Sequence, residues 1–405
     1  MPSALPAGDP APTDGSLPGS ALASLGTRPF GIYVHVPFCT VRCGYCDFNT
    51  YTLSELGDGP GASRASYAEA AIAEIRLARR VLGQIDLPVS TVFLGGGTPT
   101  LLRPAELGAI LAAVASEFGF VDDPEITTES NPDSVTAGDL GELREVGFNR
   151  VSFGMQSAVP RVLATLDRTH DPLRVPAVVQ WAREAGYEQV SLDLIYGAPG
   201  ESVADWEVSL DAALTCAPDH VSAYSLIVEE GTALARRVRR GELPMPDDDD
   251  LADKYVLADE RLGRAGLGWY EVSNWARDTA SRCRHNQLYW TGGDWWGVGP
   301  GAHSHVGGVR WWNVRHPTAY AARMAESLSP AHAREELGDA DRRVERVLLE
   351  VRLVDGLALD VLGDTGRKAV SGLVERGLVR DKGERIVLTR TGRLLADAVV
   401  RDLLP

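Results

Sequence analysis

The sequence predicts an α/β protein built around a partial (β/α)6 barrel of parallel strands. From Ile32 onward, short apolar or β-branched runs alternate with amphipathic helical stretches, and each connection is long enough for a right-handed crossover. Helical patterns such as residues 66–82 and 101–117 separate the strands. We expect strands at residues 32–37, 91–94, 125–129, 150–154, 190–195 and 220–226.

Composition limits the function classes. A chain of 405 residues with 44% hydrophobic residues can form one large core and one or two smaller domains. The net charge of −16 argues against nonspecific nucleic-acid binding, which needs a basic surface. No run approaches the length of a transmembrane segment, and the first basic residue is Arg28, so we expect no signal peptide and a cytoplasmic protein.

The chain divides by composition into four segments. Residues 1–28 are rich in Pro, Ala, Gly and Ser, and we expect a disordered leader. Residues 29–231 form the expected barrel, and residues 232–335 contain a tryptophan-rich region. Residues 336–405 show helices, a hairpin and a last helix, which predicts a winged-helix-like domain. Its charge is too balanced for a strong DNA-binding surface.

The polar residues that stand out follow the predicted strands, where such barrels carry their chemistry. A cysteine cluster at residues 39–46 follows the first strand, and a glycine run at residues 95–99 follows the second. Glu129 ends the third strand, Gln156 follows the fourth, and Asp193 lies inside the apolar fifth. We therefore expect one rim of the barrel to hold a site.

The cysteine cluster has the pattern C-x3-C-x2-C, formed by Cys39, Cys43 and Cys46. Three thiolates predict a 4Fe-4S cluster with one iron open to another ligand, because a structural zinc normally has four protein ligands. The zinc alternative would need His35 or Cys283 as its fourth ligand. An odd number of cysteines, five in all, also argues against a disulfide framework.

The glycine run and two carboxylates add to this site. Gly96 and Gly97 lack a Cβ, so the backbone can approach a ligand closely after the strand. A buried Asp193 between two leucines would be costly without a partner. Together with Glu129, it could bind an adenosine ribose or the ammonium group of methionine.

The cysteine loop resembles the signature of the radical S-adenosylmethionine (SAM) superfamily. From Gly31 onward the chain is similar to the anaerobic coproporphyrinogen III oxidase family, and especially to its HemW-type heme chaperone branch. The resemblance implies a TIM-like radical SAM barrel with a 4Fe-4S cluster, SAM and heme as cofactors. It lies in the stretches GIYVHVPFC, CGYCDF, GGGTPT, FGMQS, LDRTH, SLDLIYGAPG, YEVSNWA and HNQLYW.

The resemblance assigns two groups of residues to SAM binding. One group matches contacts to the cluster-bound cofactor: Tyr33, Gly96, Glu129 and Asp193. The other matches positions that contact a second cofactor molecule in the oxidase: Tyr45, Gly97, Thr98, Gln156 and Arg168.

One difference from the oxidase concerns Phe48. The oxidase continues its motif with another cysteine, whereas this chain reads Cys46-Asp47-Phe48. A phenylalanine cannot act as a thiol or a ligand, so a heme chaperone is expected rather than the alternative, a radical SAM oxidative decarboxylase of coproporphyrinogen III. The resemblance leaves SAM cleavage open.

His285, in the stretch HNQLYW, is the predicted heme ligand, because a neutral imidazole beside aromatic side chains suits a heme iron. A histidine satisfied in the core is the structural alternative, and His303, His305 and Cys283 are weaker ligand candidates. The resemblance implies heme, acceptor apoproteins and a reductant protein as partners, and it leaves a homodimer open.

Overall fold

A computed structural model describes residues 7–57 and 63–404 of the chain, and a sheet of 13 strands dominates it. Six consecutive parallel strands form the centre of this sheet, so the predicted α/β fold is confirmed. They are β2 (Phe30–Val36), β5 (Val89–Gly96), β6 (Phe120–Ser130), β7 (Arg150–Gln156), β8 (Gln189–Tyr196) and β9 (His220–Ser225).

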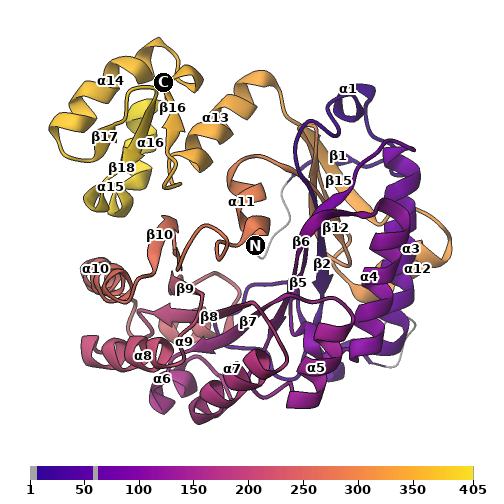
Figure 1. The fold of residues 1–405 in the computed structure, drawn as a ribbon, viewed down its shortest axis with the longest axis horizontal. Coiled ribbons are helices and arrows are strands. Elements are labelled where there is room, and N and C mark those ends of the chain that lie inside the picture. The colour runs from indigo at the N-terminus through magenta and orange to yellow at the C-terminus, as the bar shows by residue number, and fades with distance from the viewer. Residues whose placement is uncertain (1–6, 58–62, 405) are drawn as a thin grey trace.

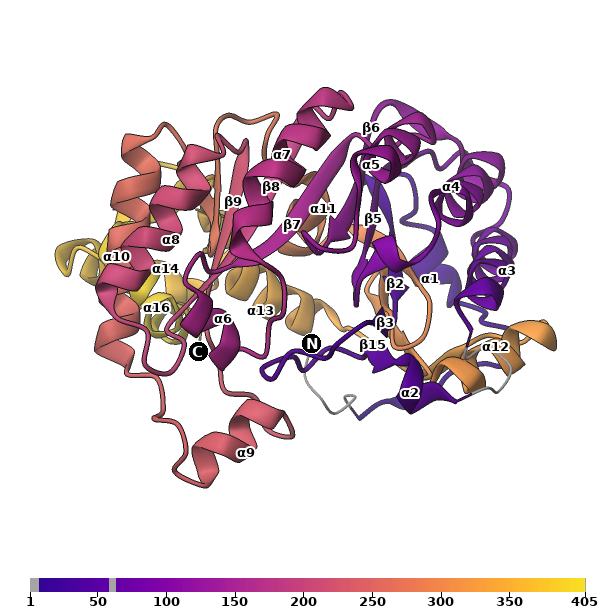
Figure 2. The same cartoon turned by 90° about the horizontal axis from the view of Figure 1, so that it is seen from below.

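Helices cover the outer side of this curved sheet (Figures 1 and 2). Successive side chains of a strand point to opposite faces of the sheet, so the apolar side chains on the outer face pack against these helices. In β5, for example, Val92 and Leu94 are buried in the apolar core, whereas Thr91 hydrogen-bonds across the inner side. The covering helices are α3 (Arg64–Leu82), α4 (Pro104–Phe118), α5 (Ala137–Glu145), α7 (Val175–Glu184) and α8 (Val203–Thr215).

The tryptophan-rich region extends the sheet at both edges. Next to β2 lies β12 (Asp294–Val298), followed by β13 (His303–Val306), β14 (Val309–Asn313) and β15 (Ala331–Glu336). At the other edge, β11 (Asn274–Ala276) pairs with β9 and β10 (Gly268–Glu271). Several tryptophans of this region are core residues: the rings of Trp296 and Trp311 meet edge to face at 4.8 Å.

Shorter elements connect these layers. The acidic run expected to open a helix does so, because Asp247 caps the first turn of α10 by accepting a hydrogen bond from the Asp250 backbone. The helix α11 lies within the curve of the sheet (Figure 1). The connecting elements are β3 (Phe38–Cys39), β4 (Tyr51–Thr52), α2 (Leu53–Leu56), α6 (Pro160–Thr165), α9 (Ala233–Arg239), α10 (Asp248–Arg264), α11 (Arg284–Trp290) and α12 (Pro317–Ala325).

The C-terminal segment has a core of its own and forms a lobe beside the open side of the sheet (Figure 1). It contains a three-stranded sheet in the order β16, β18, β17 and the helices and hairpin that the sequence predicts. The Arg393 guanidinium joins it to the main body by two hydrogen bonds to Asp259, at 2.9 and 2.7 Å. Its elements are α13 (Asp339–Glu350), β16 (Leu357–Ala358), α14 (Asp364–Glu375), β17 (Val379–Asp381), β18 (Arg385–Leu388), α15 (Arg390–Leu394) and α16 (Ala396–Leu403).

The expectation of a disordered leader is wrong for residues 7–28. The strand β1 (Asp9–Pro10) pairs with β15, and α1 (Gly19–Leu22) buries Ala21 completely. Leu17 and Leu25 also pack against the main core. Composition alone misled the prediction, because these scattered apolar residues are buried by the main body and not by a core of their own. Residues 1–6 lie outside the described part.

Among the helices of residues 7–57 and 63–404, none is long and apolar enough to cross a lipid bilayer.

The packing of the leader predicts a difference between two neighbouring alanines. Ala21→Gln places a polar side chain in a fully buried position, whereas Ala23→Gln changes an exposed one. We expect Ala21→Gln to lower the free energy of unfolding by about 2 kcal/mol or more and the control by less than about 0.5 kcal/mol. Urea unfolding followed by circular dichroism measures both. Equal stabilities would mean that the leader does not pack in solution.

Candidate functional site

The three cysteines lie on one loop at the carboxyl end of β2. All three thiols are free and partly buried. Two backbone hydrogen bonds fix the middle of the loop: Gly44 donates to the Leu166 carbonyl at 3.1 Å and accepts from Leu234 at 2.7 Å. A Cβ at Gly44 would lie 2.2 Å from a carboxylate oxygen of Asp167, so a larger residue there would displace that side chain. The loop is thus held by elements that follow β7 and β9.

The thiols influence one another electrostatically. Burial raises the pKa of Cys39 to about 12, and the neighbouring Cys46 and Cys43 thiols raise it further. The Arg168 guanidinium supplies positive charge, because it donates a hydrogen bond to the Cys43 sulfur at 3.5 Å. A bound positive centre would favour the thiolate forms in the same way. These residues therefore fit a metal cluster.

The zinc alternative needs His35 or Cys283 as a fourth ligand, and both side chains are engaged elsewhere. In a 4Fe-4S cluster each cysteine binds a different iron, so the sulfurs lie further apart than around one ion. The described residues contain no group of three or more His, Cys, Asp or Glu arranged around a single ion. The ring of His35 is occupied by the Tyr33 hydroxyl and the Asn49 carbonyl, each at 2.9 Å. Cys283 is buried beside Glu125.

The glycine run is needed for close packing against the cysteine loop. A Cβ at Gly96 would lie 2.5 Å from the His35 ring, and one at Gly97 would lie 2.4 Å from the Phe38 carbonyl oxygen. The Gly97 and Thr98 amides donate to the carbonyls of Val36 and Phe38, at 2.8 and 2.7 Å. Because an ammonium group only donates hydrogen bonds, it would contact oxygen atoms here and not the amides.

Glu129 and Asp193 face the same interior. Glu129 accepts a hydrogen bond from the Gly96 amide at 3.1 Å, and Asp193 accepts one from the Ser152 hydroxyl at 2.8 Å. Burial raises the pKa of Glu129 to about 8, with a further contribution from the charge of Asp193. Burial also raises the pKa of Tyr33, and Glu129 adds to that shift. The structure thus brings Tyr33, Gly96, Glu129 and Asp193 together in an electronegative site suited to a cation.

Arg168 connects four segments around the cysteine loop. Besides Cys43, it donates to the Asn131 side chain at 2.7 Å and to the Gly154 carbonyl at 2.8 Å. Asn131 in turn donates to the Thr98 hydroxyl at 3.0 Å. Sequence reasoning missed Asn131, although its position two residues after Glu129, at the end of the third strand, was an available signal.

Tyr45 and Gln156 complete this second group. The pKa of Tyr45 is raised by burial first and then by the Cys43 thiol, which places the phenol beside that cysteine. Gln156 has a φ of 59°, in the left-handed region, at a bulge between β7 and β8. Such backbone strain is common at functional sites. The structure therefore gathers Tyr45, Gly97, Thr98, Gln156 and Arg168 around one side of the cysteine loop.

His285 does not have an open coordination position in this structure. Its ring is fully buried, and its two nitrogens are hydrogen-bonded to the hydroxyls of Thr91 and Tyr289, each at 2.8 Å. Burial lowers its pKa to about 3. The imidazole stacks on Phe93 with ring centroids 5.3 Å apart. Binding of heme iron to His285 would therefore require one of these two hydrogen bonds to break.

The other ligand candidates are also engaged. His305 is buried and hydrogen-bonded to the Gly293 carbonyl at 2.7 Å, and His303 stacks against Trp312. Cys283 has a pKa raised by burial, with a further contribution from Glu125.

Comparison with known proteins gives one consistent result. The model of the family described as "Radical SAM superfamily" matches residues 33–213. A protein of Mycobacterium tuberculosis named "Heme chaperone HemW" is 52% identical over 389 residues, which cover 96% of this chain and 97% of that protein. Its namesake in Bacillus subtilis is 32% identical, covering 91% of this chain and 97% of that protein.

The fold also has a counterpart among solved structures. Coproporphyrinogen III oxidase (HemN) from Escherichia coli, described as a radical SAM enzyme, superposes with a TM-score of 0.80. The alignment covers 95% of this chain and 92% of that protein at 24% sequence identity. At this identity the likeness establishes the fold.

The raised pKa of Glu129 predicts a pH effect on stability. A folded-state pKa of about 8, above the ordinary value of 4.5, means that Glu129 keeps its proton to a higher pH in the folded protein than in the unfolded chain. This contribution to stability is complete below about pH 4.5 and is lost as the pH rises through 8. Glu129→Gln keeps the side chain neutral.

In cofactor-free protein, we therefore expect wild type to lose on the order of a few kcal/mol more than Glu129→Gln between pH 5 and pH 8.5, measured by urea unfolding. Parallel stability curves for the two proteins would contradict the buried, proton-retaining carboxyl group.

The surroundings of His285 predict a structural role. His285→Ala leaves the hydroxyls of Thr91 and Tyr289 without their partner in the core, so we expect a loss of about 2–4 kcal/mol in the free energy of unfolding. His332→Ala, at an exposed position, should change it by less than about 0.5 kcal/mol. Below its unfolding temperature, His285→Ala should retain heme as wild type does. Lost heme binding at unchanged stability would restore His285 as the ligand.

Proposed function

Because the chain belongs to the HemW family of the radical SAM superfamily, we propose that it binds heme and transfers it to acceptor proteins. The observation that carries this proposal is the 52% identity to a protein named heme chaperone, over nearly the whole length of both chains. The likeness to the oxidase concerns the fold. A scaffold can be shared while the function differs, so the chaperone assignment takes precedence.

The position of Phe48 supports a carrier over a porphyrinogen oxidase. Its side chain is 46% exposed beside the cysteine loop, and it offers neither a thiol nor a hydrogen-bond donor. The chain therefore lacks the additional cysteine with which the oxidase motif continues. Oxidative decarboxylation of coproporphyrinogen III is not the activity that we assign.

We propose that Cys39, Cys43 and Cys46 hold a 4Fe-4S cluster. When bound, the cluster supplies an open iron for SAM and an electron for its reductive cleavage. The Arg168 guanidinium offsets negative charge at Cys43 and orients the loop through Asn131. Electrons would come from a reductant protein.

Within the same site, Glu129 and Asp193 would attract the positively charged part of SAM. Tyr33 lies beside Glu129 and Gly96 presents backbone close to it, so these four residues form the proposed cofactor contacts. The second group makes hydrogen bonds inside the protein: Arg168 donates to three partners, and the Thr98 hydroxyl accepts a hydrogen bond from Asn131. We propose that this group stabilises the cysteine loop.

The cellular setting follows from the thiols. The five cysteines are all free, and free thiols persist in the reducing cytoplasm. We propose that the protein works there and that it meets its heme acceptors in the same compartment.

Anaerobic reconstitution tests the function. Wild type supplied with iron, sulfide, SAM and reductant should bind heme and pass it to a heme-free acceptor, and it should form no protoporphyrinogen from coproporphyrinogen III. Cys43→Ala should lose most of its cluster iron, because one thiolate ligand is missing, whereas Cys216→Ala should keep it. Iron content, heme absorption and porphyrin chromatography measure these outcomes.

Two results would contradict these assignments. Formation of protoporphyrinogen by wild type would identify an oxidase. A fully loaded cluster in Cys43→Ala would refute the cysteine ligands.

A further inference from the structure

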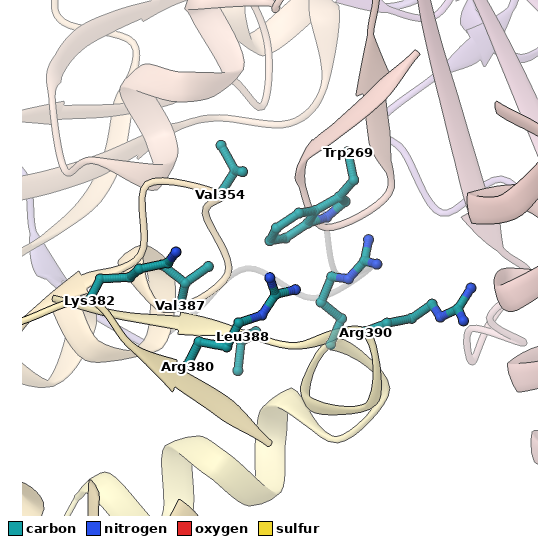
Figure 3. A pocket seen from close by; sticks show the side chains of 8 residues that line it. Trp269, Val354, Arg380, Lys382, Val387, Leu388 and Arg390 are labelled. Atoms are coloured by element: carbon teal, nitrogen blue, oxygen red, sulfur yellow. The ribbon is translucent and has the colours of Figure 1, made fainter. Parts of the chain in front are cut away.

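A basic cleft lies between β10 of the main body and the β17–β18 hairpin of the C-terminal lobe (Figure 3). Its volume is about 230 Å³. Strand pairing places it at the level of Val221, near the amino end of β9, since Trp269 pairs with Trp275 and Trp275 with Val221. The cysteine loop follows the carboxyl end of β2. The cleft is thus separate from the proposed cluster site.

Four cations line the cleft, and two of them have no acidic partner. Arg393 is hydrogen-bonded to Asp259, and Arg390 to Glu260 at 3.0 Å. Within residues 7–57 and 63–404, no carboxylate pairs with Arg380 or Lys382, and no carboxylate lines the cleft. The remaining positive charge favours an anionic ligand, on a chain whose net charge is −16.

The two unpaired cations are placed to act together. Arg380 lies in β17 and Lys382 directly follows this strand, and both residues line the cleft. Figure 3 shows both beside the same opening, with Trp269 on the opposite side. A ligand that carries two acidic groups would match this pair.

The rest of the cleft is apolar. The indole of Trp269 forms one wall, and Val354, Val387 and Leu388 form others. The Arg393 guanidinium lies 4.4 Å from the centre of the Trp269 ring. This cation–π contact helps to hold the indole in place. The Trp269 ring N–H is buried without a hydrogen-bond partner. Aromatic and aliphatic walls of this kind suit a flat apolar group.

The wall formed by Trp269 belongs to β10, which packs near α11 and the residue before it. Burial raises the pKa of the Glu271 carboxyl to about 8, while the hydrogen bond that it accepts from Asn274 and the nearby Trp290 oppose this shift. The Cys283 amide donates to the Tyr270 hydroxyl at 3.2 Å. Residues 283–290 thus hold the two residues that follow Trp269 in β10.

We propose that this cleft binds the carboxylate-bearing edge of heme, with Arg380 and Lys382 facing its propionates and Trp269 against the ring. The inference rests on the proposed function, because it identifies where the cargo binds. The cleft is smaller than a whole tetrapyrrole, so the iron and the opposite edge stay accessible to an acceptor. A carrier needs this exposure, because its cargo must leave.

A charge reversal with a matched control tests the proposal. Arg380→Glu/Lys382→Glu should weaken heme binding about tenfold or more, because charge-assisted hydrogen bonds to the propionates are lost. Lys368→Glu/Arg401→Glu makes the same change at two exposed positions of the same lobe that do not line the cleft. This control should bind heme like wild type. Heme titration followed by absorption, with circular dichroism to verify folding, measures both.

Heme dimethyl ester separates the carboxylates from the ring. Wild type should bind the ester about tenfold more weakly than heme, and Arg380→Glu/Lys382→Glu should not distinguish the two ligands. Equal heme affinity in wild type and this variant would overturn the cleft and leave the proposed function intact. Failure of wild type to bind heme would overturn the function itself. Adenosine monophosphate displacing heme from the cleft at lower concentration than heme binds would identify a nucleotide site instead.

Discussion

A single buried carboxylate, that of Glu125, holds α11 inside the curve of the sheet. It accepts hydrogen bonds from the Arg284 and His285 amides, both at 2.9 Å, and lies 3.9 Å from Arg150. The first amides of a helix have no partners within the helix, and a buried charge is costly without compensation. The Glu125 carboxylate and the first amides of α11 therefore satisfy each other's hydrogen bonds. As a result, the start of α11 can be buried inside the sheet.

Two parts of the molecule depend on this placement. On one side, the His285 ring packs under Phe93 and near Tyr33, so it forms part of the floor beneath the proposed cofactor site. On the other side, Trp290 lies near Glu271 of β10. The stretch HNQLYW thus contributes residues to the surroundings of both proposed sites.

The two proposed sites use different ends of the barrel. Cysteines, glycines and carboxylates gather at the carboxyl ends of the strands, as expected for parallel β/α architectures. The basic cleft lies near the amino end of β9, where the C-terminal lobe meets β10.

The sequence by itself determined the features that depend on neighbouring residues. Short apolar or β-branched runs located the parallel strands, as in the predicted 150–154 and the observed Arg150–Gln156, and the spacing of Cys39, Cys43 and Cys46 predicted a shared loop. Tertiary structure decided the features that join distant segments. Packing of residues 7–28 against the core, the 194-residue separation between His285 and Thr91, and the cleft between two lobes have no local signal. Their stability comes from contacts that form only when the whole sheet is assembled.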